Sequence, residues 1–164
     1  MKNLNERLIK LLNYRIEQEE YSSRLYKEMS IWLDYNGYFG AASLWKKYSN
    51  EEIKHAEWAY QFLLDLDYKP EVPALKKPEC DCSSLIEVVQ KSYKHEQDIT
   101  EQCQNLAQEA FSAGDYMTLH LAQKYLDEQT EELAKLVYWL DRLEAFGTSQ
   151  ENLRLLDNEM KDAD

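Results

Sequence analysis

A pattern of residue types that can ligate a metal occurs twice along the chain with the same spacing. Glu19 is followed 33 residues later by Glu52, and His55 comes three residues after that. Adding 77 to these three numbers gives a second set: Glu96, Gln129 and Glu132. Residues three apart on a helix lie on one face, so each pair can grip one ion. The repetition predicts two helical halves that direct carboxylates and an imidazole towards one two-metal centre.

The predicted ligands are mostly carboxylates, which suit iron or manganese better than soft metals. Burying several carboxylates without a cation would be costly, and some of them would take up protons. The alternative is an ordinary acidic helix face, because 31 of the 164 residues are Asp or Glu. A single Glu-x-x-His would fit that alternative. The repeat at matched spacing favours the metal centre instead.

Helices must position these residues, since apolar residues recur every three or four positions. The low content of 4 Gly and 3 Pro also favours long uninterrupted helices. We expect Gly37 to end the first helix and Ser83 or Ser84 to begin the third. The pattern predicts four long helices and a short fifth one, over about 5–34, 39–66, 83–111, 115–146 and 150–161.

The connections between these helices constrain their topology. The turns near 36 and 114 are short, so their flanking helices should be antiparallel neighbours. Residues 67–82 hold all three prolines and could span about 50 Å. The second helix would be about 42 Å long, so this crossover can start the third helix parallel to the second. We predict one all-α domain over 1–164, a four-helix bundle with a long crossover.

Composition excludes several classes of function. A net charge of −12 argues against nucleic-acid binding through phosphate contacts. No apolar run approaches the length of a membrane span, and the N-terminus lacks the apolar core of a signal peptide. These features predict a cytoplasmic protein with no membrane partner.

The three cysteines fit a reducing compartment, because an odd count suits a disulfide framework poorly. Cys80 and Cys82 are expected to be two unrelated thiols in the crossover, with metal binding or redox chemistry as the alternative. Cys103 is expected to pack as a small apolar residue.

Four separated segments of the chain resemble the non-haem bacterial ferritins in order and spacing. They are EYSSRLY at 20–26, EEIKH at 51–55, YKHEQ at 93–97 and EQTEE at 128–132. The resemblance covers essentially the whole chain and implies a ferritin-like bundle in a hollow shell of about 24 subunits. It implies a ferroxidase that uses dioxygen or hydrogen peroxide to oxidise Fe(II) and stores Fe(III) as a mineral. The short last helix would lie at the four-fold contacts of the shell.

The resemblance also implies roles for the repeated residues. One iron would be held by Glu19, Glu52 and His55. Glu52 would bridge to a second iron, which Glu96 would also hold. Gln129 occupies the position of a family glutamine near that second iron.

Further roles follow from the same resemblance. A third iron site would use Glu51, Glu128 and Glu131, with Glu132 shared between this site and the di-iron centre. Tyr26 occupies the position of a family tyrosine that lies beside the centre and can supply an electron.

Two positions depart from family patterns. Ile53 stands where haem-containing relatives carry a methionine, so no haem is expected. Lys124 stands where many bacterial ferritins carry a tryptophan, which removes an aromatic electron donor from that position. Two alternatives stay open: a di-iron oxidase or peroxide scavenger without storage, and a non-enzymatic acidic scaffold.

Overall fold

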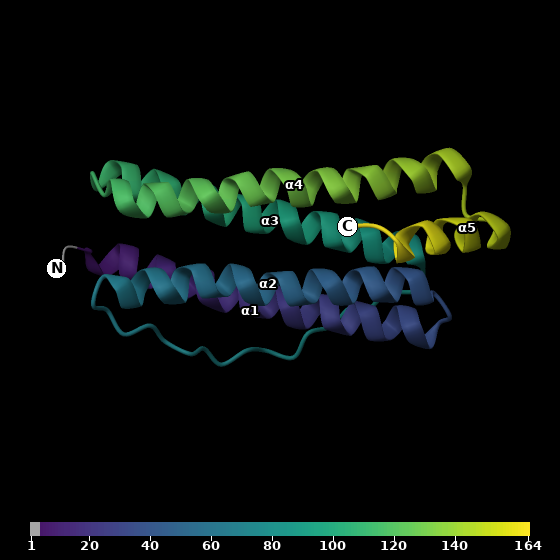
Figure 1. Cartoon of the computed structure of the whole chain (residues 1–164), viewed down its shortest axis with the longest axis horizontal. Helices are drawn as coiled ribbons and strands as arrows, with labels where there is room; N and C mark the ends of the chain where they lie inside the picture. Colours follow the sequence, from purple (N-terminus) through teal and green to yellow (C-terminus); the bar gives the residue numbers. More distant parts are fainter. Residues whose placement is uncertain (1–3) are drawn as a thin grey trace.

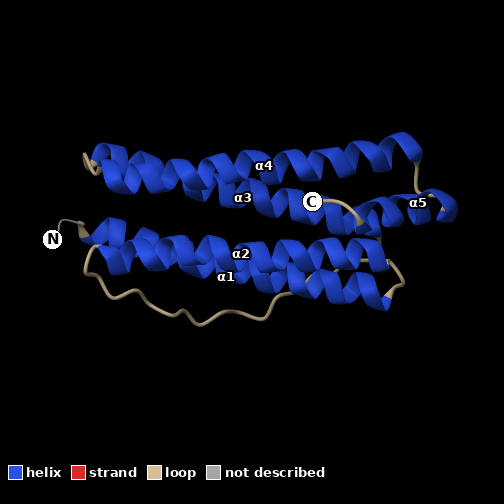
Figure 2. Cartoon of the chain, in the orientation of Figure 1, coloured by secondary structure: helices blue, strands red, loops and turns tan. Residues whose placement is uncertain are grey.

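The computed structural model describes residues 4–164, and its helices form a long bundle (Figure 1). In chain order they are α1 (Glu6–Tyr35), α2 (Phe39–Asp65), α3 (Leu85–Ser112), α4 (Tyr116–Phe146) and α5 (Gln150–Lys161). Within these described residues there is no strand (Figure 2). The predicted all-α four-helix bundle with a short fifth helix is confirmed, and residues 1–3 of the predicted domain lie outside the described part.

Local side-chain caps explain why most helix boundaries were predictable. The side chains of Asn5, Ser84, Asp115 and Ser149 each accept a hydrogen bond from a backbone N–H of the helix that follows. Such caps satisfy amide groups that have no partner within their own helix. Gly37 has φ of +86°, the left-handed conformation expected for the turn after α1.

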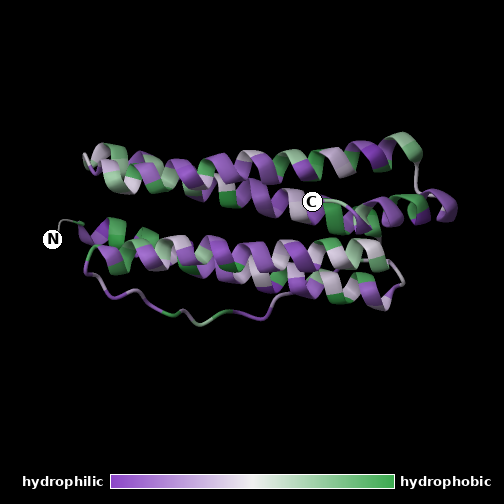
Figure 3. Cartoon of the chain, in the orientation of Figure 1, coloured by the Kyte–Doolittle hydropathy of each residue, from purple (hydrophilic) through white to green (hydrophobic). Residues whose placement is uncertain are grey.

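The crossover between α2 and α3 travels the length of the bundle (Figure 1). α3 therefore runs parallel to α2, as predicted, while α1 with α2 and α3 with α4 form antiparallel hairpins. Each long helix mixes hydrophilic and hydrophobic residues along its length, as expected for amphipathic helices (Figure 3). Among the residues described, none of the helices is long and apolar enough to cross a membrane.

The apolar core consists of two clusters. The first includes Met29, Trp45 and Leu156, and α5 contributes to it. The second includes Leu12 and Ile16 and draws on the N-terminal part of α1. Neither cluster contains the buried acidic residues, which instead occupy a polar layer of the bundle interior. Burial of the two apolar clusters stabilises the bundle and offsets the cost of burying the polar layer.

Helix α5 completes the N-terminus of α2. The Tyr38 side chain caps none of the first amides of α2. Instead Asp157 of α5 accepts a hydrogen bond from the Ala41 backbone N–H at 2.8 Å. The two backbones approach so closely at Gly40 that a Cβ there would lie 1.8 Å from the Asp157 carbonyl oxygen. Only glycine permits this approach.

The crossover contains a disulfide bond between Cys80 and Cys82. The prediction of two unrelated thiols was wrong. Asp81 has φ of +46°, and the two flanking Cα atoms are 5.1 Å apart, which lies within the range that a disulfide spans. A count cannot reveal this local backbone conformation. Cys103 is free and buried, as expected.

Candidate metal centre

The polar layer takes side chains from all four long helices. Each of its side chains is 5% exposed or less. They belong to Glu19 of α1, Glu52 and His55 of α2, Glu96 of α3, and Gln129 and Glu132 of α4. The predicted repeat therefore converges inside the bundle. Buried carboxylates of this kind need a cation, a hydrogen-bond donor or a proton.

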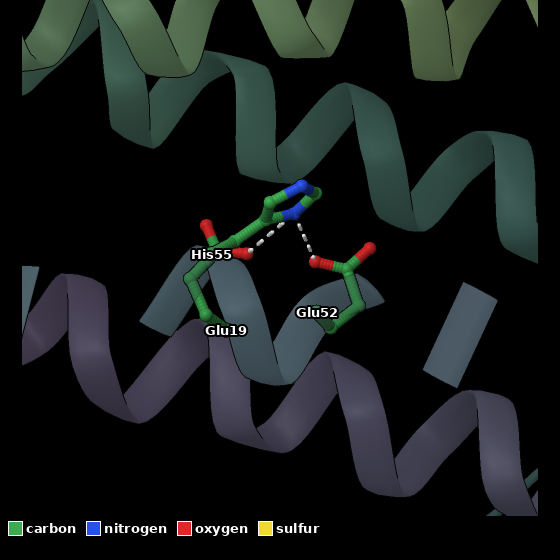
Figure 4. A group of neighbouring side chains, drawn as sticks. All are labelled: Glu19, Glu52 and His55. Atoms are coloured by element: carbon green, nitrogen blue, oxygen red, sulfur yellow. Dashed lines mark hydrogen bonds and ion pairs between the residues drawn. The ribbon is translucent and has the colours of Figure 1, made fainter. Parts of the chain in front are cut away.

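Glu19, Glu52 and His55 form the tightest group of this layer. Each offers one ligand atom, and these atoms lie within 4.8 Å of one another. The His55 Nδ1 atom is 2.9 Å from Glu52 Oε2 and 3.8 Å from Glu19 Oε2. Both carboxylates are directed towards the imidazole, Glu52 from the same helix as His55 and Glu19 from the neighbouring α1 (Figure 4). The three side chains are placed to share one metal ion.

Glu96 is held from two sides. The Tyr26 hydroxyl donates to one of its oxygens, and the Gln129 side-chain amide donates to the other at 2.8 Å. The same amide group lies 3.2 Å from the Thr100 hydroxyl oxygen. The predicted second-site residues therefore contact one another directly, and these bonds fix the Glu96 carboxylate in place.

Two of the carboxylates predicted for the third site, Glu132 and Glu51, lie beside a lysine that the sequence pattern did not single out. Lys135 Nζ is 3.5 Å from Glu132 Oε1 and 4.0 Å from Glu51 Oε2. Glu128 Oε1 lies 3.4 Å from Nε2 of the site histidine, whereas Glu131 is exposed. The structure thus brings Glu51 and Glu128 to the edge of the layer and leaves Glu131 at the surface.

A buried arginine is the second residue that sequence reasoning missed. Arg15 is 1% exposed, and its Nε donates to Glu19 Oε1 at 3.0 Å. Its other nitrogens contact Gln102 Oε1 at 3.0 Å and Cys103 Sγ at 3.6 Å. The available signal was a charged residue on the apolar stripe of α1, one turn before Glu19. Arg15 leaves Glu19 Oε2 free to face the centre.

An aromatic side chain from α2 lies beside the site. The Trp58 ring centroid is 4.8 Å from that of His55 and 5.3 Å from that of Tyr125. Lys124, at the position where the family resemblance leads one to expect tryptophan, places its ammonium 3.9 Å from the Trp58 ring centroid. An indole therefore adjoins the site histidine even though position 124 carries a cation.

Burial dominates the electrostatics of the layer. It raises the pKa of Glu96 to about 7 and that of Glu132 to about 8, from an ordinary value of 4.5. Burial also raises the pKa of Glu52, and the nearby Glu96 and Glu19 carboxylates raise it further. Several carboxylates thus lie close together in the buried layer, and bound cations would reduce the repulsion between their negative charges.

These shifts predict how the stability of the metal-free protein changes with pH. Between the ordinary pKa of 4.5 and the raised values near 7 and 8, the folded state binds more protons than the unfolded state. Stability contributed by Glu96 and Glu132 is therefore complete below pH 4.5 and is lost as pH rises through 7 and 8. We expect the free energy of unfolding to fall by on the order of a few kcal/mol across this window.

The measurement is urea unfolding of the chelator-treated protein between pH 5 and pH 9. In the variant Glu132→Gln the free energy of unfolding should fall less steeply with pH, because the glutamine side chain does not titrate. A divalent ion that binds the centre should also flatten the profile. A wild-type stability that rises steadily from pH 5 to pH 9 would contradict the shifts described above.

The chain is similar to known proteins over nearly its whole length. A family model described as Ferritin-like domain matches residues 9–146. A protein named bacterial non-heme ferritin from Escherichia coli O157:H7 is 35% identical over 98% of both chains. Another from Campylobacter jejuni is 34% identical over 96% of this chain and 95% of its own. The solved structure of an open pore ferritin from Archaeoglobus fulgidus gives a TM-score of 0.95 at 26% identity, covering 99% of each chain.

Proposed function

The chain belongs to the ferritin family, and from this membership we propose that it oxidises Fe(II) at a di-iron ferroxidase centre and stores Fe(III) as a mineral. The shell would be hollow and contain about 24 subunits in the cytoplasm. One observation carries the proposal: Glu19, Glu52 and His55 place three buried ligand atoms within 4.8 Å of one another. Oxygen donors with one imidazole nitrogen are a donor set that suits iron.

The two irons are substrates that enter the polar layer as Fe(II). Glu19 and His55 would hold the first iron, and Glu52 would bridge it to the second. Glu96 would hold the second iron, with its carboxylate orientation set by the Tyr26 hydroxyl and the Gln129 amide. Fixed positions of this kind let one oxidant molecule, dioxygen or peroxide, take one electron from each of two irons.

Residues at the edge of the polar layer would bind iron as it moves to or from the di-iron centre. Glu51, Glu128 and Glu131 would form a third and weaker site, and Glu132 would be shared with it. Lys135 contacts two of these carboxylates, so an iron ion there would compete with an ammonium partner. The net charge of −12 favours the approach of Fe(II). Tyr26 would supply an electron when the oxidant demands more than the two irons provide.

Anaerobic titration of the metal-free protein with Fe(II), followed by a pulse of oxygen, tests this proposal. We expect binding to saturate at about two to three irons per chain, with a fast change in absorbance after oxygen is added. Sedimentation of the iron-loaded protein then tests storage, because a mineral requires a closed shell. Absence of stoichiometric binding would refute the di-iron centre, and a small oligomer with fast oxidation would refute storage.

A further inference from the structure

The disulfide between Cys80 and Cys82 lies outside the polar layer, at the point where the crossover meets α3. Cys80 is buried in the first apolar cluster, whereas Cys82 is half-buried and Asp81 is exposed. Lys91 of α3 donates to the carbonyl oxygen of Cys80 at 3.0 Å and to that of Asp81 at 2.6 Å. One sulfur atom of the bridge is therefore shielded, and the other lies near solvent.

This bridge contributes little constraint to the fold. A disulfide restricts the unfolded chain more as the loop it closes grows longer, and here the bonded residues are separated by only two positions. Other contacts already hold the segment, since Pro78 is buried, Lys91 grips two carbonyls, and the Ser83 N–H donates to Glu87 at 2.9 Å. A disulfide with a structural role is expected to join segments that no other contacts hold together, and this one does not.

The surroundings of the bridge favour its opening. Asp81 lies in the left-handed region, with φ of +46°, a conformation that aspartate tolerates better than most residues other than glycine and asparagine. The Lys91 ammonium is held beside this segment by the Cys80 and Asp81 carbonyls, and α3 begins three residues after Cys82, so both would favour negative charge on a departing thiolate. The neighbouring acids Glu79 and Asp81 are exposed, so water screens them.

We propose that Cys80 and Cys82 form a reversible thiol–disulfide exchange site that accepts electrons from a dithiol reductant. A thiolate of the reductant attacks Cys82 Sγ, the S–S bond breaks, and Cys80 leaves as a thiolate that takes up a proton. The second thiolate of the reductant attacks its own sulfur in the mixed disulfide, which releases Cys82. Two electrons and two protons enter the site, and the reductant leaves as a disulfide. This chemistry is independent of iron.

Differential alkylation of the folded protein tests the site, with dithiothreitol as the reductant and iodoacetamide as the label. Without reductant we expect no label, and after reduction we expect two, at Cys80 and Cys82. Cys103 is an internal control, because burial raises its pKa to about 11 and keeps it unreactive until the protein unfolds. Treatment with oxidised dithiothreitol should restore the unlabelled state. Labelling before reduction, or a bridge that opens only on unfolding, would overturn the proposal.

Two variants separate exchange from a structural role. Lys91→Met should slow reduction by roughly threefold to tenfold, whereas Lys94→Met, one turn away and paired with Asp98, should not. The double variant Cys80→Ala/Cys82→Ser, which places no hydroxyl in the apolar cluster, should stay close to the urea midpoint of the wild type. A large loss of stability in the double variant, or an unchanged rate in Lys91→Met, would contradict the proposal.

Discussion

Replacing Glu52 with alanine is expected to slow the fast oxidation of Fe(II) by more than about 100-fold, since even an outer partner of a metal ligand contributes about 10- to 100-fold. Glu52 is 3% exposed and lies 2.9 Å from His55 Nδ1. It is the carboxylate proposed to bridge both irons, so its loss removes a ligand from each. Stopped-flow absorbance after mixing the Fe(II)-loaded protein with oxygen measures the effect.

Glu57→Ala is the matched control for this variant. Glu57 is an exposed carboxylate on the same helix, and its removal changes the net charge by the same amount. The control should oxidise Fe(II) at the wild-type rate. If both variants keep the fast phase, oxidation takes place elsewhere, and the repeated pattern is only an acidic helix face.

Replacing Arg15 with methionine is expected to destabilise the metal-free protein by about 3–5 kcal/mol, the usual cost of leaving one partner of a buried ion pair uncompensated. Arg15 and Glu19 are each 1% exposed, and their charged groups are 3.0 Å apart. Methionine fills part of the volume but leaves the Glu19 carboxylate without its cation. The urea midpoint at neutral pH measures the change.

Two further variants show whether the buried charge is responsible. In Arg15→Met/Glu19→Gln the carboxylate is also removed, so most of the lost stability should return. Arg7→Met breaks an ion pair with Glu109 in which the arginine is largely exposed, and it should stay close to the wild type. If Arg15→Met alone leaves the midpoint unchanged, the guanidinium does not stabilise Glu19.

The fold could be predicted almost completely because its determinants are local. Helix ends follow caps such as Ser84 and Asp115, which act within three residues of themselves. The direction of α3 follows from the length of the crossover, which needs no knowledge of side-chain contacts. The disulfide could not be predicted, because two cysteines separated by one residue also occur as free thiols, and their bonding depends on the backbone conformation between them.

The site residues that belong to the sequence repeat were predictable, whereas the residues that reach the site through packing between helices were not. The proposed ligands occur twice along the chain with the same spacing, so the repeat alone was enough to identify them as one group. Arg15 meets Gln102 and Cys103 across two helices, at sequence separations of 87 and 88. Trp58 meets Tyr125 in the same way. Contacts between α1 and α3, or between α2 and α4, leave no periodic signal in a single sequence.

The close approach of α5 to Gly40 determines how the chain can be cut and extended. Truncation before Gln150 would leave the Ala41 amide without its Asp157 acceptor and would uncover apolar surface of the first cluster. The last helix thus packs into the same apolar cluster as α1 and α2, and a fusion partner must leave it intact.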